Sequence, residues 1–143
     1  MEPIAELMDE HFQLLELSGN IDRDLAAGDR RAAEDGLLML ERRLDEHVDR
    51  EERGIFAALK AQGDFFDAVV DLEEEHVAFD SELEDLAPDA VGFDDRVARL
   101  LDKLSDHIDK ENLGVFPVAV TILGASGWDI VSRAHAAPVG GML

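Results

Sequence analysis

The chain has 143 residues, of which 34 are acidic and 13 are basic, so its formal net charge is −21. A surface this acidic repels phosphate groups, which makes nucleic acids and anionic membranes poor partners. The absence of cysteine excludes disulfides and thiolate metal ligands. With 46% hydrophobic but only 6% aromatic residues, the composition favours a single helical domain over a β-sandwich.

Apolar residues recur at alternating steps of three and four along four segments, which is the spacing of a packed helical seam. The segments cover residues 4–25, 30–62, 65–86 and 97–118, and they are separated by Gly28-Asp29, Gly63-Asp64 and Pro88-Asp89. Pro117 is expected to kink or fray the last turn of the fourth segment. Four helices with short connections predict an all-α fold, an up-down-up-down antiparallel four-helix bundle over residues 1–123.

After residue 123 the apolar seam ends in a glycine-containing stretch, Gly124-Ala125-Ser126-Gly127. We expect residues 124–143 to form a C-terminal tail, which could include a short helix. Trp128 is expected to pack this tail against the bundle, and His135 is expected at the surface. At the other end, residues 1–6 contain no basic segment leading into an apolar run, so we expect no signal peptide. No apolar run reaches the roughly 18 residues needed to span a bilayer. These features together favour a cytoplasmic location.

A His-x-x-x-Glu motif occurs twice, at His47–Glu51 and at His107–Glu111, and each copy runs on to a glycine and a phenylalanine. On a helix, residues at this spacing share one face, one turn apart. The first and third segments also resemble each other, since Leu7-Met8-Asp9-Glu10-His11 matches Leu72-Glu73-Glu74-Glu75-His76. The chain is therefore an internal repeat, and the bundle should have a pseudo-twofold axis.

Each predicted helix carries one histidine on its apolar seam. The residue counts from each histidine to the neighbouring turn are similar on both sides of that turn, to within about two helical turns at about 1.5 Å per residue. The four imidazoles should therefore lie in one layer of the core. The carboxylates of Glu51 and Glu111 lie one turn beyond this layer and lean back toward it, because helical side chains point toward their own N-terminus.

A single histidine on an apolar face is most often a hydrogen-bonded core residue, but a buried carboxylate without a partner is costly. Convergence of four imidazoles and two carboxylates therefore favours a metal site over a metal-free structural bundle. The candidate ligands are His11, His47, Glu51, His76, His107 and Glu111. Six nitrogen and oxygen ligands exceed a closed tetrahedral zinc site, and calcium and magnesium prefer oxygen alone.

Two histidine pairs that share two carboxylates suit a dinuclear site, and the mixture of imidazole and carboxylate suits iron. The predicted cofactor is two Fe ions, with Mn or Zn as possible substitutes. Two carboxylates and an oxo or hydroxo bridge would largely offset the charge of the two ions.

The order of these six residues resembles the hemerythrin-like, or HHE cation-binding, domain over about residues 2–122, and more narrowly its subgroup with the pattern H-HxxxE-H-HxxxE. The resemblance implies a non-haem di-iron centre in which His11 and His47 serve one iron and His76 and His107 the other, with both glutamates bridging. Oxygen-carrying hemerythrins have a further histidine where this chain has Asp80, and an HxxxxD motif whose last position is Asn112 here. Asp80 is therefore an additional candidate ligand, and these departures argue against simple reversible carriage of O₂.

Six apolar residues are expected either to line a dry pocket at this centre or simply to pack the core: Leu14, Leu44, Phe56, Phe79, Leu104 and Phe116. Gly54 and Gly114 are expected to permit close helix approach. Glu10 and Glu75 precede histidines and are expected to face solvent, with the orientation of an imidazole as a lesser alternative.

The leading hypothesis is a di-iron protein that binds O₂ or reacts with small oxidants such as peroxide or NO, with enzymatic turnover left open. The alternatives are an iron or oxygen sensor or a metal-storage module without turnover, and a metal-free bundle.

Overall fold

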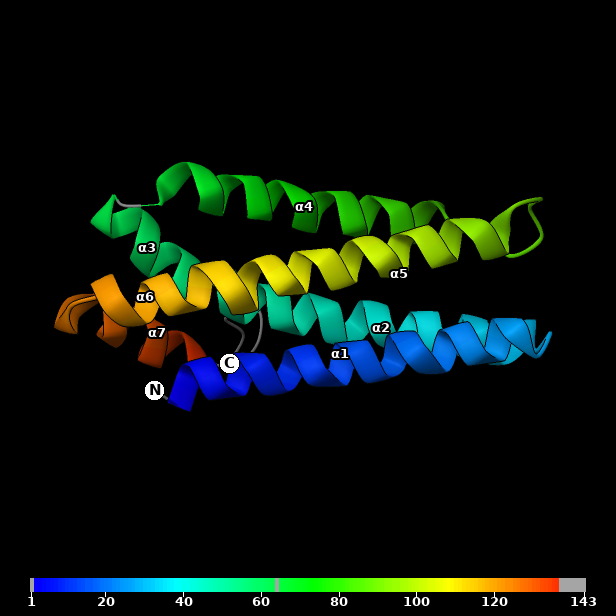
Figure 1. The fold of residues 1–143 in the computed structure, drawn as a ribbon, viewed down its shortest axis with the longest axis horizontal. Coiled ribbons are helices and arrows are strands. Elements are labelled where there is room, and N and C mark those ends of the chain that lie inside the picture. The colour runs from blue at the N-terminus through cyan, green and yellow to red at the C-terminus, as the bar shows by residue number, and fades with distance from the viewer. Residues whose placement is uncertain (1, 64, 137–143) are drawn as a thin grey trace.

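The computed structural model describes residues 2–63 and 65–136, a part of the chain that is helical and contains no strand. Four long rods pack side by side and alternate in direction (Figure 1). The rods are α1 (Glu2–Ala26), then α2 (Arg30–Glu51) with η1 (Glu52–Phe56) and α3 (Ala57–Gln62), then α4 (Phe66–Asp85), and then α5 (Phe93–Lys110) with η2 (Glu111–Val115) and α6 (Phe116–Ile122). The predicted all-α four-helix bundle is confirmed. None of the described helices combines the length and apolarity of a membrane-spanning segment.

The turns between the rods use the residues that the sequence places there. Asp29 precedes α2, and its side chain accepts a hydrogen bond from the Ala32 N–H at 3.1 Å, which satisfies a free donor at the helix start. Gly63 ends α3 with φ at 89°, a left-handed conformation that costs glycine little. Its N–H donates to the carbonyls of Leu59 and Lys60 at 3.1 Å, which closes the helix end.

The apolar core is divided into two clusters by a polar layer across the middle of the bundle. One cluster contains residues such as Leu7, Phe56 and Leu72, and the other contains residues such as Leu14 and Leu44. On the first three rods, the histidine stands between the buried residues of the two clusters, and on the fourth rod only Ile108 of the second cluster follows His107. The polar layer is therefore enclosed by apolar packing from both ends.

The second and fourth rods each contain a π-helical turn at the glutamate of the His-x-x-x-Glu motif. These turns are η1 and η2. In η2 the Phe116 N–H bonds to the Glu111 carbonyl, one residue further back than in an α-helix. Pro117 then lies in the first turn of α6, where its missing N–H is tolerated. The expected kink or fraying after Pro117 is wrong, because α6 continues to Ile122 and the irregularity lies before the proline.

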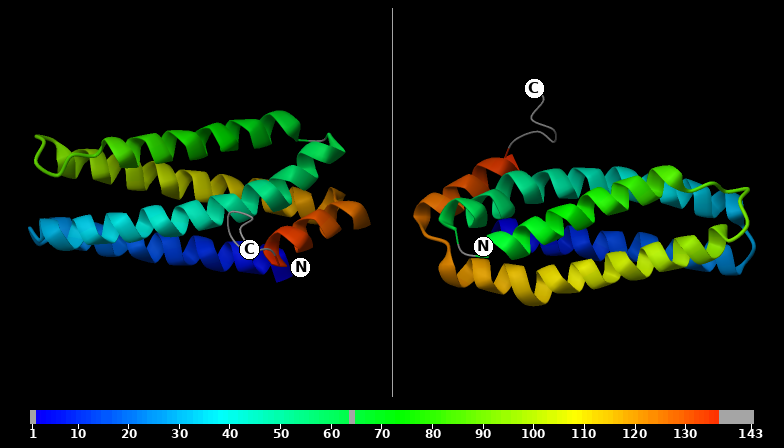
Figure 2. Two further views of the ribbon diagram at one scale, coloured as in Figure 1. Left: turned by 180° about the vertical axis from the view of Figure 1, so that it is seen from behind. Right: turned by 90° about the horizontal axis from the view of Figure 1, so that it is seen from above.

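Beyond the four rods, α7 (Ala125–Ala136) packs against η1 and α3 at the end of the bundle where α1 begins (Figure 2). The tail thus forms a full helix up to Ala136, while residues 137–143 of the predicted tail lie outside the described residues. Trp128 packs against the neighbouring apolar cluster, as predicted. The surface position expected for His135 is wrong, since its side chain is 5% exposed and its Nδ1 lies 2.7 Å from Glu6 Oε2.

The two glycines of the π turns have different surroundings. A Cβ placed on Gly54 would lie 3.2 Å from the Cβ of Ala134, so the predicted close approach is present and its partner is α7. A Cβ on Gly114 would meet nothing within 4 Å, so the same expectation is wrong there. Only the Gly54 copy of the repeat is closely packed, because α7 covers η1 and no described helix covers η2 in the same way.

The substitution Gly54→Val should lower the free energy of unfolding by about 1–3 kcal/mol, because the added side chain is forced against α7. The matched substitution Gly114→Val should change it by less than about 0.5 kcal/mol, since valine is no worse than glycine in a helix. Urea unfolding followed by circular dichroism measures both. Equal losses for the two variants would contradict the packing of α7 on η1.

Candidate metal centre

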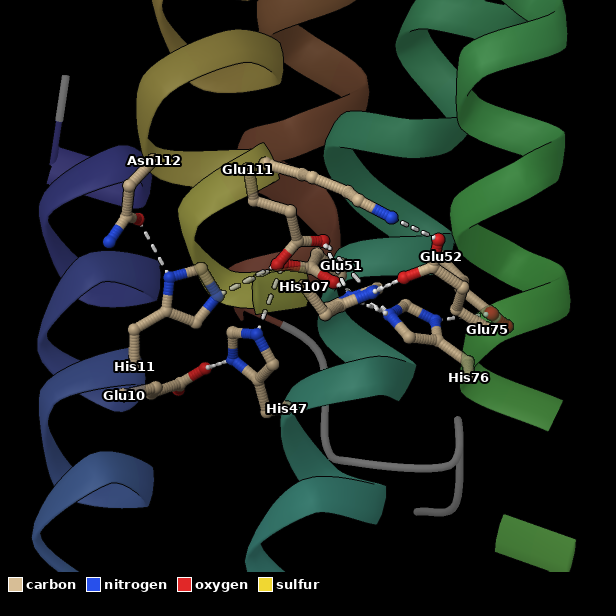
Figure 3. A network of polar contacts seen from close by, with 11 residues as sticks. Glu10, His11, His47, Glu51, Glu52, Glu75, His76, His107, Glu111 and Asn112 are labelled. Atoms are coloured by element: carbon tan, nitrogen blue, oxygen red, sulfur yellow. Dashed lines mark hydrogen bonds and ion pairs between the residues drawn. The ribbon is translucent and has the colours of Figure 1, made fainter. Parts of the chain in front are cut away.

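The structure brings all six predicted residues into one buried group at the middle of the bundle (Figure 3). One histidine comes from each of α1, α2, α4 and α5, while Glu51 ends α2 and Glu111 begins η2. Both glutamates are 0% exposed, and no histidine of the group exceeds 6%. The predicted layer of imidazoles therefore exists, and the two carboxylates lean into it.

Glu51 presents one oxygen to each pair of histidines. Its Oε2 lies 3.0 Å from His47 Nε2 and 3.5 Å from His11 Nε2. Its Oε1 lies 3.2 Å from His76 Nε2. The carboxylate thus spans the space between the two halves of the repeat.

Glu111 does the same from the opposite side. Its Oε1 lies 2.9 Å from His11 Nε2, and its Oε2 lies 3.4 Å from His107 Nε2 and 4.0 Å from His76 Nε2. The result is two sets of four potential ligand atoms. Within each set, all four atoms lie within 4.8 Å of one another. The sets are His11, His47, Glu51 and Glu111, and Glu51, His76, His107 and Glu111, so both carboxylates are shared.

The outward-facing Nδ1 atom of every imidazole has an oxygen partner. The four partners are Asn112 for His11 at 2.8 Å, Glu10 for His47 at 2.7 Å, Glu52 for His76 at 2.9 Å and Glu75 for His107 at 2.8 Å. The solvent-facing role expected for Glu10 and Glu75 is therefore wrong, and the lesser alternative applies.

These partners determine which ring nitrogen is free. Asparagine and carboxylate oxygens accept a hydrogen bond, so each imidazole donates Nδ1–H and, when the ring is neutral, directs the lone pair of Nε2 toward the centre. The carboxylates of Glu10 and Glu75 are themselves held, by Arg50 and by Lys110 respectively. Each ring is thus fixed in the tautomer and orientation that metal coordination requires.

Several buried polar atoms at the centre of the group have no hydrogen-bond partner: His11 Nε2, Glu51 Oε1, and both oxygens of Glu111. The Nε2 atoms of His76 and His107 also face each other at 3.0 Å. Buried polar atoms are nearly always satisfied in proteins, so nitrogen and oxygen atoms that face one space without hydrogen bonds are suited to hold a cation, or protons in its absence. These residues fit bound metal ions.

Without a metal, protons neutralise the group. Burial alone disfavours a charged imidazole, but carboxylates within 3.5 Å, those of Glu111 and Glu51, raise the pKa of His11 to about 10. Burial also lowers the pKa of His47 and of His76, but the neighbouring carboxylates outweigh it and raise the pKa of both imidazoles to about 9. Burial would raise the pKa of Glu51, but the surrounding imidazoles hold it well below its usual value. Any metal must therefore displace protons from these imidazoles.

Three phenylalanines pack on the imidazoles. The ring of Phe116 stacks on His11 with centroids 5.4 Å apart, and Phe56 stacks on His76 at 5.6 Å. Phe79 meets His107 edge-on at 5.4 Å. All six apolar residues predicted around the centre are buried, and they act as core packing that keeps water from the ligand atoms.

Asp80 is not brought to the group. Its side chain is exposed, and it lies beside Val77 at a surface cavity between α2 and α4. The potential ligand sets contain four residues each without it.

Comparison with known proteins places most of the chain in one family. The family model of the hemerythrin HHE cation binding domain matches residues 2–119, which covers the four rods except the last three residues of α6 and includes all six residues of the group. No curated protein and no solved structure matches the chain.

The metal-free protein should lose stability as pH rises above about 6.5. A histidine whose pKa is raised by folding contributes its full stabilisation below its unfolded pKa of about 6.5, and this is lost as pH passes the folded values of about 9 and about 10. Glu51 has the opposite sign, so acid below about pH 4.5 should also destabilise the protein.

Urea unfolding of chelator-treated protein at a series of pH values measures this. We expect the free energy of unfolding to fall between pH 6.5 and 9.5 by more than about 1.4 kcal/mol, the equivalent of one pKa unit. A constant or rising free energy of unfolding over that range would contradict the protonation of these histidines in the metal-free folded protein.

Proposed function

This chain belongs to the hemerythrin HHE cation-binding domain family, and on that basis we propose that it is a cytoplasmic non-haem di-iron protein that binds O₂ or reacts with small oxidants such as peroxide and NO. The observation that carries the proposal is the sharing of Glu51 and Glu111 between two histidine pairs. Carboxylates that present one oxygen to each of two imidazole pairs are suited to bridging two metal ions.

In this proposal His11 and His47 hold one iron, His76 and His107 hold the other, and the two glutamates bridge them. This is the ligand order of the H-HxxxE-H-HxxxE subgroup, to which we assign the chain. Each ion would have two imidazole and two carboxylate ligands, a number that leaves room for an exogenous molecule because iron accepts more than four ligands. Bound iron would supply Lewis acidity and one-electron redox capacity.

The residues of the chain itself hold and isolate the ions. Glu10, Glu52, Glu75 and Asn112 hold the imidazoles at Nδ1, and the stacked phenylalanines restrict water around the Nε2 atoms. A small uncharged molecule such as O₂ or NO suits such apolar surroundings better than a charged one.

A second function, a metal-dependent sensor or store without turnover, is favoured by one observation. The carboxylates of Glu10, Glu52 and Glu75 each contact an imidazole Nδ1 atom from outside the group. Proton transfer to a bound substrate needs an acid or base within reach of it, and these carboxylates lie on the opposite side of the imidazoles from Nε2. This observation leaves binding favoured over acid–base chemistry.

Metal analysis of the purified protein with stopped-flow spectroscopy tests the proposal. We expect about two irons per chain and a spectral change on mixing the iron-loaded protein with O₂, peroxide or NO. The double variant Glu51→Gln/Glu111→Gln should lose the iron, because the bridging oxygens are removed, whereas Asp80→Asn should retain it. Iron retained by the double variant would contradict the ligand assignment. Iron binding without a response to any of the three oxidants would favour the sensor or store.

The partners of the imidazole Nδ1 atoms give a separate prediction. The substitution Glu10→Ala should weaken metal binding by about 10–100-fold, because His47 loses the acceptor that orients it. The matched Glu10→Gln retains a carbonyl acceptor and should lose much less. Competition between the protein and a chelator for Co²⁺ measures both affinities, and equal losses would show that the hydrogen bond does not position His47.

A further inference from the structure

A surface cavity of about 350 Å³ lies between α2 and α4 and reaches His76 at the edge of the candidate metal centre. Its outer lining includes the exposed side chains of Asp45, Val77 and Asp80. Its inner lining includes His76, one of the six residues of the buried group, and Glu52. The cavity therefore connects solvent to an imidazole of the centre.

The mouth of this cavity is strongly acidic. Partial burial, together with the carboxylates of Asp80 and Glu84, raises the pKa of Asp45. Burial and the carboxylates of Asp45, Asp80 and Glu84 also raise the pKa of Glu41, so the acidic side chains of this face extend beyond the two that line the mouth. In the described part of the chain, no lysine or arginine forms an ion pair with any of these four acidic side chains. Such a mouth attracts cations and repels anions.

Glu52 joins the mouth to the centre. Its side chain is 36% exposed, and its Oε2 lies 2.9 Å from His76 Nδ1. The Nε2 atom of the same imidazole lies 3.2 Å from Glu51 Oε1, an oxygen without a hydrogen-bond partner. Carboxylate oxygens thus occur at the mouth, at the inner end of the cavity and in the centre itself.

The corresponding positions in the other copy of the repeat are uncharged. In the repeat, Ser105 stands where the first copy has Asp45, and Asn112 stands where it has Glu52. On α1, Leu15 takes the place of Asp80. The two halves of the repeat therefore supply the same imidazole arrangement but only one acidic approach to it.

We propose that divalent cations reach the metal centre through the cavity between α2 and α4, guided by the carboxylates of Asp45, Asp80 and Glu52. The inference rests on the proposed metal centre. It assigns to Asp45 and Asp80 a role in loading the centre only, whereas Glu52 also holds His76 in place. Loading through this side would make the rate of uptake depend on charge and salt, while the final amount of bound metal would not.

Stopped-flow uptake of Co²⁺ by metal-free protein, followed by its visible absorption, tests this route. The variant Asp45→Asn/Asp80→Asn should take up Co²⁺ about tenfold more slowly at low ionic strength, within the range of electrostatic steering. The difference from the wild type should shrink at high salt, where the Debye length is about 3 Å. The control Asp35→Asn/Asp102→Asn makes the same change in net charge at exposed positions outside the cavity, and its uptake should match the wild type.

A second pair of variants tests the route without changing charge. Val77→Trp should obstruct the mouth and slow uptake, whereas Phe12→Trp, at the equivalent exposed position of α1, should not. Circular dichroism and thermal unfolding verify that all four variants fold. Rates equal to those of the controls, with normal final binding, would overturn the route alone. Absence of Co²⁺ binding by the wild type would overturn the proposed metal centre and the route with it.

Discussion

The burial of two carboxylates is the constraint on which the rest of the structure depends. Glu51 and Glu111 are removed from water at the middle of a bundle whose core is otherwise apolar above and below them. A buried charge is stable only beside opposite charge or a metal ion. The imidazoles meet that requirement in either state, because those of His11, His47 and His76 favour the protonated form without metal, and all four could hold a metal ion beside the carboxylates. The positions of the histidines on all four rods follow from this requirement.

Much of the fold and the composition of the centre could be predicted, because both follow from the spacing of apolar residues and histidines along each helix. The steps of three and four placed each histidine on a seam, and counting residues to Gly28 and Gly63 placed the imidazoles at one height. Side-chain direction on a helix then placed the carboxylates of Glu51 and Glu111 in the same layer. These arguments need only helix geometry and short turns, which this chain satisfies.

Other features depend on tertiary contacts that periodicity does not carry. The π turn moves Glu52 and Asn112 out of a regular helical register, and nothing in the apolar pattern marked them as partners of His76 and His11. A signal was nevertheless present, since both residues directly follow a motif glutamate and both can accept a hydrogen bond. The docking of α7, and with it the burial of His135, depends on packing against a distant segment that pattern analysis does not identify.

The internal repeat also affects how the two sides of the centre can differ. Each half of the chain is a helical hairpin that contributes two imidazoles and one carboxylate, so two identical hairpins paired about a twofold axis would assemble the same six groups. In such a pair, any substitution would occur twice. A single chain lacks that restriction, and the contrasts between Asp80 and Leu15 and between Glu52 and Asn112 are differences that two identical hairpins could not hold. The two sides of one centre can therefore specialise separately.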